Sequence, residues 1–271
     1  MAGGKKVDPG LKFLHQAFGL ESLHFGLFTE DMPHRLEGLR EAQEEYTRAL
    51  LALVPEDAKT VLDVGCGVGG TTKELREAGF AAEGLSPDPY HKEQFPITCG
   101  PDAPFHHSPF ESFSPGKTYD CLLFSESPQY IDKDAFFPKS VELTKPGSNL
   151  VVSDFFTIAP GGAYPRAFPR DDFEARAKSA GFEVASFRDV TQEILPSFEI
   201  MSTFLGYGQR FFEMVQEMAS RRFLGKLGRF FFRKKLRHIR EELFVRMPDQ
   251  FDMDRFAKTM SYCMYRLERK S

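Results

Sequence analysis

Residues 61–70, Val61-Leu-Asp-Val-Gly-Cys-Gly-Val-Gly-Gly70, decide the fold of this chain. The segment 60–64 has the apolar character of a buried strand, and it leads directly into a turn that is rich in glycine. The segment 71–78 then has helical character and stops at Gly79. Glycine permits positive φ angles and removes side chains that would block a ligand, while the N-terminus of a helix attracts anions. We therefore expect a strand, a loop and a helix, with a small molecule bound at the loop.

The glycine spacing alone admits two kinds of ligand. Gly65, Gly67 and Gly70 satisfy the GxGxxG fingerprint of dinucleotide sites, with Glu83 at about the distance of the acid that holds a ribose. Asp63 stands just before this turn, where a carboxylate would repel a pyrophosphate but attract the α-ammonium group of an amino acid. The sequence therefore favours a zwitterionic ligand. A tight turn that binds no ligand remains the alternative interpretation of these glycines.

The rest of the chain alternates strand-like and helix-like segments. Such alternation predicts an α/β fold, in which helices cover both faces of a mostly parallel sheet in a Rossmann-like, doubly wound arrangement. We expect seven strands, of which the patterns identify 60–64, 80–85, 119–124, 149–156, 183–189 and 260–269. The helices expected between them cover 71–78, 135–144 and 171–180.

The pattern also predicts how the chain is organised. Residues 1–54 are expected to form an N-terminal helical lid, which includes an amphipathic helix from Arg35 to Leu53. Residues 55–195 form the predicted core that binds the cofactor. An insertion that is helical, aromatic and basic follows at 196–258 and is expected to cap the substrate, and 259–271 supply the last core strand. The lid and the insertion together form the expected helical cap.

Composition excludes several classes of protein. The 271 residues are 41% hydrophobic and 27% charged, which is ordinary for a globular protein and excludes collagen, disorder and coiled coils. No apolar run is long enough to span a bilayer, and the N-terminus does not resemble a signal peptide, so we expect a cytoplasmic protein. The four cysteines are scattered and are expected to be free thiols. The net charge of −4 gives no overall attraction to nucleic acid, and none is expected as a partner.

The stretch Val61–Gly70 resembles the first motif, hhD/ExGxGxG, of the class I S-adenosylmethionine-dependent methyltransferases. Further along the chain, Glu83–Pro87 resembles the second-strand motif of that family, Tyr119–Ser127 the fourth strand, and Leu143–Ser148 the turn before the fifth. The resemblance extends over roughly residues 55 to 190 and implies small-molecule methylation, with S-adenosylmethionine as cofactor and S-adenosylhomocysteine as product. Leu23–Phe28 and Leu85–Pro87 resemble the subgroup that contains tocopherol, sarcosine and phosphoethanolamine methyltransferases.

The resemblance also implies which residues bind the cofactor. The turn would cradle the methionine part, and Asp63 would meet its ammonium group. Many relatives have an acid at the tip of the second strand to hold the ribose, but this chain has Gly84 there, so Ser86 and Asp88 are preferred over Glu83 for that role. At the position of the adenine, the stretch from His106 to Glu111 offers Ser108 and, as a stacking ring, Phe110, and a plain loop is the alternative interpretation of both. The residues implied for the cofactor site are Asp63, Gly65, Cys66 (through its backbone), Gly67, Gly69, Ser86, Asp88, Ser108, Phe110 and Ser125.

Methyl transfer from a sulfonium is an in-line displacement, so the protein must mainly position the reactants and exclude water. A hydroxyl or an acidic carbon as acceptor would also call for a base. We expect Gln129 and Tyr130, which follow the fourth strand, in the active site. His24 is the most plausible base, because the ordinary pKa of histidine is suitable, although a packed structural histidine is the alternative. Asp154 could orient the substrate or merely cap a loop. The adjacent pair His106 and His107 lacks metal-ligand spacing, and no metal is expected.

The chain has 29 phenylalanines and no tryptophan. Most of these rings are expected in the core, but their number also suits a pocket for an apolar or aromatic acceptor that is methylated at oxygen or carbon. An N-methyltransferase of a small amine is the nearest alternative. A catalytically silent fold that binds the cofactor, and a dehydrogenase, are alternatives of other classes.

Residues 221–240 contain nine Lys or Arg, no acid, and apolar residues at helical spacing. Such a helix could contact an anionic membrane or an acidic partner, or it could pack on the core with a solvated basic face. The expected assembly is a monomer or a homodimer.

Overall fold

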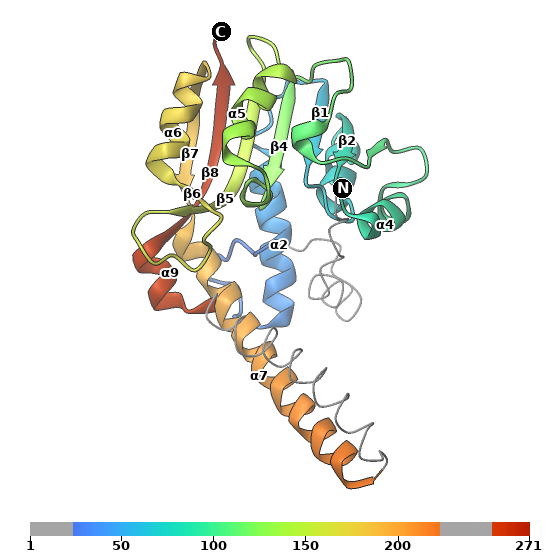
Figure 1. The fold of residues 1–271 in the computed structure, drawn as a ribbon, viewed down its shortest axis with the longest axis vertical. Coiled ribbons are helices and arrows are strands. Elements are labelled where there is room, and N and C mark those ends of the chain that lie inside the picture. The colour runs from blue at the N-terminus through green and yellow to red at the C-terminus, as the bar shows by residue number, and fades with distance from the viewer. Residues whose placement is uncertain (1–23, 223–250) are drawn as a thin grey trace.

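The centre of the fold is a sheet built around β1 (Thr60–Val64), the strand that precedes the glycine turn. A computed structural model describes residues 24–222 and 251–271. Within these residues the sheet has eight strands, of which seven follow the order β3-β2-β1-β4-β5-β8-β7 (Figure 1). β1 lies between β2 (Ala81–Leu85) and β4 (Cys121–Ser125). β3 (Phe105–His106) pairs with β2, and β5 (Asn149–Thr157) pairs with β4, all in parallel.

The last strand of the chain, β8 (Met260–Arg269), returns into the sheet between β5 and β7 (Phe182–Asp189). It runs antiparallel to both neighbours, and its register with β5 extends from Thr157 opposite Met260 to Asn149 opposite Glu268. The predicted fold class, a mostly parallel Rossmann-like sheet with helices on both faces, is confirmed. An additional short strand, β6 (Phe168–Pro169), pairs with β5 outside the main order.

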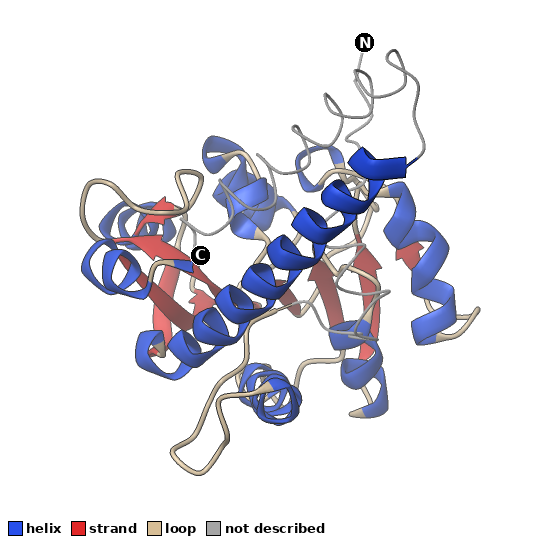
Figure 2. Cartoon of the chain, turned by 90° about the horizontal axis from the view of Figure 1, so that it is seen from below, coloured by secondary structure: helices blue, strands red, loops and turns tan. Residues whose placement is uncertain are grey.

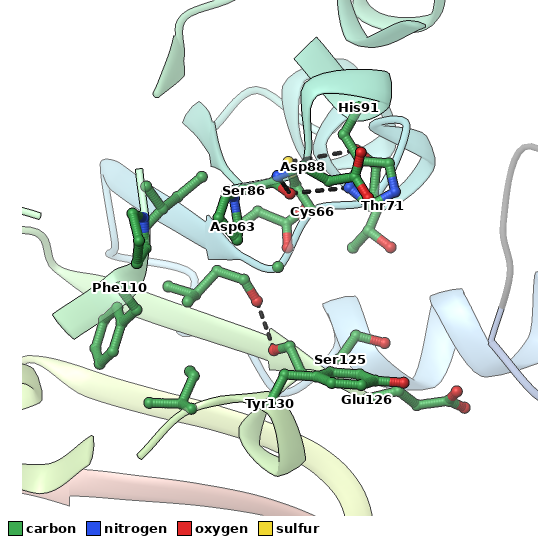
Figure 3. Close-up of a pocket in the computed structure, with 18 of the residues that line it drawn as sticks. Asp63, Cys66, Thr71, Ser86, Asp88, His91, Phe110, Ser125, Glu126 and Tyr130 are labelled. Atoms are coloured by element: carbon green, nitrogen blue, oxygen red, sulfur yellow. Dashed lines mark hydrogen bonds between the residues drawn. The ribbon is translucent and has the colours of Figure 1, made fainter. Parts of the chain in front are cut away.

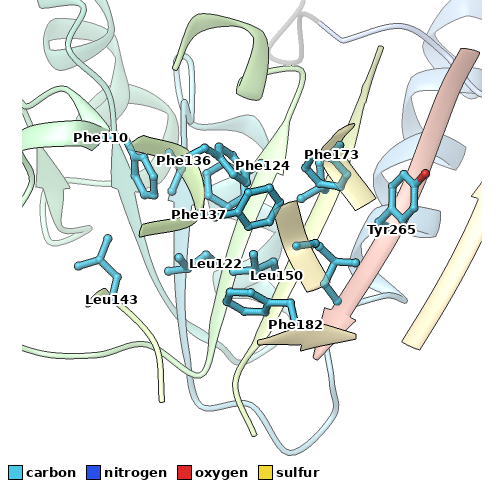
Figure 4. Close-up of a cluster of buried hydrophobic side chains, with 14 of the residues drawn as sticks. Phe110, Leu122, Phe124, Phe136, Phe137, Leu143, Leu150, Phe173, Phe182 and Tyr265 are labelled. Atoms are coloured by element: carbon cyan, nitrogen blue, oxygen red, sulfur yellow. The ribbon is translucent and has the colours of Figure 1, made fainter. Parts of the chain in front are cut away.

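Helices cover both faces of the sheet (Figure 2). On one face, α5 (Lys133–Glu142) and α6 (Arg170–Ser179) pack phenylalanine rings against the strands, including Phe136 and Phe173 (Figure 4). On the other face, the buried side chains come from α2 (Leu36–Leu51), α3 (Gly70–Glu77), α7 (Thr191–Arg222) and α9 (Met253–Thr259). The strands contribute apolar residues to both faces, as expected for a sheet buried on both sides.

The predicted strands and helices are present with small shifts of their ends, but α4 (Pro89–Cys99) was not predicted. Proline at its first position suits a helix start, whereas Pro96 in its interior is a helix breaker and hides the helical pattern. Two-residue strands such as β3 and β6 are too short to produce any periodic signal.

The described parts of the expected cap contain helices, although residues 24–35 are irregular. Residues 24–54 contain α2, and α7 runs from the end of the core away from the sheet (Figure 1). The expected lid residues 1–23 and most of the basic stretch 221–240 lie outside the described residues. Among the helices that the structure describes, none is long and apolar enough to cross a membrane.

Parallel pairing brings the carboxyl ends of the strands to one edge of the sheet. Val64 on β1 is paired with Leu85 on β2 and with Phe124 on β4. The turn that begins at Gly65 and the segments that begin at Ser86 and Ser125 therefore lie next to one another. This edge is the usual ligand site of open α/β sheets.

Candidate active site

A cavity of about 510 Å³ opens at this edge of the sheet (Figure 3). Most of the predicted site residues line it, although they come from segments up to about a hundred positions apart. Gly69 and Gln129 are predicted residues that are not among the lining residues. The predicted residues that line the cavity are His24, Asp63, Gly65, Cys66, Gly67, Ser86, Asp88, Ser108, Phe110, Ser125 and Tyr130.

The glycine turn has the left-handed backbone that its sequence suggested. Gly65 has a φ of 80° and Gly67 a φ of 57°, values that L-residues with a side chain rarely adopt. A Cβ atom on Gly65 would lie 2.4 Å from the Cβ of Ser127, so this glycine allows the tips of β1 and β4 to approach. At Gly67 a Cβ atom would have no atom within 4 Å, which places that backbone against the open cavity.

Gly69 has a different role in the turn. It precedes α3 as the N-cap, and a Cβ atom there would lie 2.5 Å from the sulfur of Cys99. Its contacts are therefore with α4 behind the turn. The Cys66 side chain is buried, and burial raises the pKa of its thiol well above the ordinary value, so this thiol stays protonated.

Asp63 is a buried carboxylate that lines the cavity, with a 1% exposed side chain. The hydroxyl of Thr72, in the first turn of α3, donates a hydrogen bond to its Oδ2 at 2.6 Å. Burial raises the pKa of Asp63 to about 7, and the bond from Thr72 opposes this shift. A neutral hydroxyl cannot compensate the charge of a buried carboxylate, so the site is suited to a cationic group of a ligand.

The two residues preferred for the ribose, Ser86 and Asp88, lie just after the end of β2. Ser86 and Asp88 line the cavity, and the Ser86 hydroxyl lies 2.9 Å from Nδ1 of His91, a further lining residue. Asp88 also caps α4, where its Oδ1 accepts the backbone N–H of Tyr90 at 2.7 Å.

Glu83 points away from the cavity. It binds Lys117 at 2.6 Å, His106 at 2.8 Å and Tyr119 at 2.9 Å. Although burial opposes it, these bonds lower the pKa of Glu83 below its ordinary value. Glu83 is accordingly not among the residues that line the cavity.

Gly84 explains why this chain lacks an acid at the tip of the second strand. A Cβ atom there would lie 2.4 Å from Cε2 of Phe95, so the ring from α4 occupies the space that an acidic side chain would need.

The two residues expected near an adenine both line the cavity, with different partners. The Ser108 hydroxyl donates to the carbonyl of Pro109 at 3.0 Å. The Phe110 ring is 3% exposed and packs edge-on against Phe124, with the ring centres 5.4 Å apart. Phe110 is the one phenylalanine among the described lining residues. The other phenylalanines of the described residues are not among the residues that line this cavity.

The segment after β4 has a strained backbone at Glu126. This residue has a φ of 51°, and it is the one described residue other than glycine with a positive φ. Its neighbours are fixed, because Ser125 lies 2.8 Å from the hydroxyl of Tyr46, and Ser127 donates to the carbonyl of Val64 at 2.5 Å. Strain of this kind persists only where the surroundings enforce it, and it is common at functional sites.

Glu126 lines the cavity with a partly buried side chain. Its Oε1 accepts the backbone N–H of Phe25 at 2.9 Å and the hydroxyl of Tyr262 at 2.9 Å. Burial raises the pKa of Glu126 to about 7, against the effect of these two bonds. The sequence analysis missed this residue, although it lies within the Tyr119–Ser127 motif. Only the backbone conformation and the partners from distant segments distinguish it.

His24 lines the cavity but is held by structural contacts. Its ring stacks on Tyr46 with centres 4.1 Å apart, Nδ1 lies 2.8 Å from the carbonyl of Phe25, and Nε2 lies 3.2 Å from the hydroxyl of Thr47. Burial lowers the pKa of His24 to about 4, so the ring is neutral and weakly basic near pH 7. The expectation that His24 has a suitable pKa for a general base is corrected.

Of the pair after β4, Tyr130 reaches the cavity and Gln129 does not. Tyr130 is 54% exposed at the mouth of the cavity. The backbone N–H of Gln129 donates to Oδ2 of Asp154 at 3.1 Å, and its side-chain amide lies 3.5 Å from the carbonyl of Glu126. Asp154 is 1% exposed and not among the lining residues, and burial raises its pKa well above the ordinary value. It therefore anchors the segment of Gln129.

Within residues 24–222 and 251–271, no group of three or more His, Cys, Asp or Glu is arranged to hold a metal ion.

Comparison with known proteins identifies the family to which this chain is similar. The model of a family described as "Methyltransferase domain" matches residues 38–187. A 27-O-demethylrifamycin SV methyltransferase from Amycolatopsis mediterranei is 24% identical over 84% of this chain and 89% of its own length. A 2-methyl-6-phytyl-1,4-hydroquinone methyltransferase from Synechocystis is 31% identical over 35% of this chain and 32% of its own length.

Among solved structures, a putative sarcosine dimethylglycine methyltransferase from Galdieria sulphuraria superposes with a TM-score of 0.68. The match covers 97% of this chain and 99% of that one, at 16% identity. At this identity the likeness concerns the fold.

Proposed function

The chain belongs to the methyltransferase domain family and is a class I S-adenosylmethionine-dependent methyltransferase of the small-molecule type, and we propose that its acceptor is apolar or aromatic and is methylated at oxygen or carbon. The family model matches more than half of the chain. The acceptor class is inferred from the names of the relatives, a hydroquinone and a rifamycin methyltransferase. Another relative, matched over 67% of this chain, is an O-methyltransferase by name, which favours oxygen.

The observation that supports the cofactor is Asp63 beside the open backbone of Gly67. The buried carboxylate of Asp63 has the neutral hydroxyl of Thr72 as its hydrogen-bond donor. Gly67 leaves its backbone accessible from the cavity. These are the features that a bound amino-acid group requires, because its ammonium group needs a counter-charge and its carboxylate needs backbone N–H groups. We propose that Asp63, Gly65, Gly67 and the backbone of Cys66 hold the methionine part of S-adenosylmethionine.

The remaining parts of the cofactor are assigned by proximity along the same edge of the sheet. Ser86 and Asp88 are proposed for the ribose, because both line the cavity at the end of β2 while Glu83 is turned away. Ser108 and Phe110 are proposed for the adenine. When bound, the cofactor supplies an electrophilic methyl group, and the protein must hold the acceptor in line with it and exclude water.

The first experiment tests the cofactor with no knowledge of the acceptor. A ligand that binds only the folded state raises the melting temperature, so S-adenosylhomocysteine should stabilise the protein whereas NAD should not. Stabilisation by NAD alone would indicate a dehydrogenase and would remove the proposal. Asp63→Asn should reduce the stabilisation by S-adenosylhomocysteine. Glu83→Gln is its matched control, because Glu83 does not line the cavity and this variant should keep the full stabilisation.

A second experiment tests the reaction. Incubation of metabolite extracts with S-adenosylmethionine that carries a labelled methyl group should label a small apolar product that bears the methyl on oxygen or carbon. Label on nitrogen would instead support the amine alternative. Binding of S-adenosylhomocysteine without any labelled product would favour a fold that binds the cofactor without catalysis.

A further inference from the structure

Two carboxylates face the same cavity, the buried Asp63 and the partly buried Glu126, and the known partners of both are uncharged. Asp63 is bound by the hydroxyl of Thr72, and Glu126 by a backbone N–H and the hydroxyl of Tyr262. Burial of a carboxylate is costly unless a positive charge compensates it. The proposed cofactor carries two positive charges, an ammonium and a sulfonium. The structure thus offers one carboxylate for each charge, while the proposed function uses only Asp63.

The topology places Glu126 beside the glycine turn. β1 and β4 are neighbouring strands, and Ser127 is bonded to the carbonyl of Val64, directly before the glycine turn. Glu126 therefore stands beside the turn that would hold the methionine part. Both donors bind the same oxygen of its carboxylate, Oε1, and both lie on the side of α2 and β8. The residue lines the cavity in a left-handed conformation that a non-glycine residue adopts at a cost on the order of 1 kcal/mol.

We propose that the carboxylate of Glu126 pairs with the sulfonium of the bound methyl donor and then accepts the proton that the methyl acceptor releases. This inference rests on the proposed function and adds a residue and a chemical requirement to it. The acceptor must carry a removable proton on the atom that is methylated, as a hydroxyl or an acidic carbon does.

The change of charge during methyl transfer explains why one carboxylate would both pair with the sulfonium and accept the proton. A carboxylate that only paired with the sulfonium would stabilise the substrate more than the transition state, because the positive charge disappears during transfer. In the proposed step the acceptor atom donates an electron pair to the methyl carbon, and the pair of the broken carbon–sulfur bond remains on sulfur. The proton of the acceptor passes to Glu126. One cation and one anion are thereby converted into a neutral thioether and a neutral carboxylic acid.

The groups around Glu126 allow it to be the group that titrates near neutral pH. Burial raises the pKa values of Tyr46, Tyr164 and Tyr262 far beyond neutrality, so these hydroxyls stay protonated. His24, with its pKa of about 4, stays neutral. Asp154, whose pKa burial also raises, is the other carboxyl that interacts with Glu126, and the cationic Arg166 lines the same cavity.

The experiment compares the affinities of S-adenosylmethionine and S-adenosylhomocysteine by titration calorimetry from about pH 6 to about pH 8.5. The two molecules share the ammonium group and differ by the methyl group and the sulfonium charge, so the effect of Asp63 is common to both and cancels in their ratio. If Glu126 faces the sulfonium, the preference for S-adenosylmethionine should rise about tenfold as the carboxyl ionises. A pH-independent ratio would overturn the inference while leaving the proposed function intact. Failure of both molecules to bind would overturn both.

Variants assign the titrating group. Glu126→Gln should remove the rise in the ratio while both molecules still bind, and a rise that persists in this variant would overturn the assignment. Glu174→Gln is the matched control, because Glu174 also accepts a tyrosine hydroxyl, that of Tyr265 at 2.6 Å, but does not line the cavity. It should keep the wild-type rise. If Glu126→Gln does not fold, Tyr262→Phe serves instead, since loss of this donor should move the midpoint of the rise to higher pH and an unmoved midpoint would oppose the inference.

Discussion

The hydroxyl of Tyr262 lies 2.9 Å from Oε1 of Glu126, although 136 positions separate the two residues. Tyr262 reaches this position because β8 returns into the sheet beside β5, whereas Glu126 follows β4 on the other side of β5. The same hydroxyl lies 3.0 Å from that of Tyr46 on α2. The last strand of the chain therefore holds in place a lining residue of a site whose residues come mainly from its first half.

Tyr262→Phe tests this link. The hydroxyl stabilises the ionised carboxyl, so its removal should raise the pKa of Glu126 above about 7. The pH at which the protein begins to prefer S-adenosylmethionine over S-adenosylhomocysteine should rise accordingly. Stability should fall by about 1 kcal/mol, the usual cost of a lost hydrogen bond, which denaturant unfolding would measure.

Tyr265→Phe is the control for that variant. Tyr265 lies three residues further along β8, packs against the opposite face of the sheet and donates to Glu174 at 2.6 Å. Its loss should cost a similar free energy of unfolding and leave the pH dependence of binding unchanged. An equal shift of the midpoint in both variants would mean that the effect arises from general loosening of β8.

Asp63 should make binding of S-adenosylhomocysteine depend on pH. Its pKa is about 7 in the free protein, and an ammonium group binds only the ionised form well. Affinity should therefore be full above about pH 8 and decline as the pH falls below about 7. Calorimetry on Asp63→Asn should show a loss of about 2 kcal/mol at pH 8 and no decline toward lower pH. If the affinity of Asp63→Asn declined toward low pH as that of the wild type does, Asp63 would not have this role.

The same two carboxyls should make the free protein less stable at higher pH. Folding raises the pKa of Asp63 from 3.8 and that of Glu126 from 4.5, each to about 7, so the folded state favours the protonated forms. Their contribution to stability is full below about pH 4 and is lost as the pH rises through about 7. Each carboxyl accounts for a loss on the order of 4 kcal/mol by this linkage.

Urea unfolding at about pH 6 and about pH 8 would measure the last part of this loss, about 1.4 kcal/mol for each carboxyl. Asp63→Asn should reduce the difference in stability between these two pH values, because its amide does not ionise. A variant that lost the same stability at both pH values would contradict the assigned pKa.

Much of the fold was predictable because its strands are short apolar runs bounded by glycine and proline. β1 was predicted at its observed bounds, and the turn, the helix after it and β8 followed from equally local patterns. α4 escaped because Pro96 interrupts it, and the two-residue strands lack any period. These errors concern elements whose formation depends on packing, such as the contact of Phe95 with Gly84.

The site was predictable only where one segment contains both the signal and the function. Asp63 and the glycine turn form such a segment. Glu126 depends on a backbone conformation and on Tyr262 from a distant strand, neither of which leaves a trace in local sequence. His24 was favoured for an ordinary pKa that burial against Tyr46 abolishes. Burial and distant partners are thus what the sequence analysis could not supply.

Gly67→Ala, compared with Gly79→Ala, separates backbone strain from ligand contact. Both glycines have a positive φ, 57° and 94°, and at both a Cβ atom would meet nothing within 4 Å. Each substitution should therefore cost a similar free energy of unfolding, on the order of 1 kcal/mol, through strain alone. Only Gly67 faces the cavity, so only Gly67→Ala should weaken the binding of S-adenosylhomocysteine, by about tenfold or more. Calorimetry on the two variants checks this, and equal affinities would mean that the turn does not contact the cofactor.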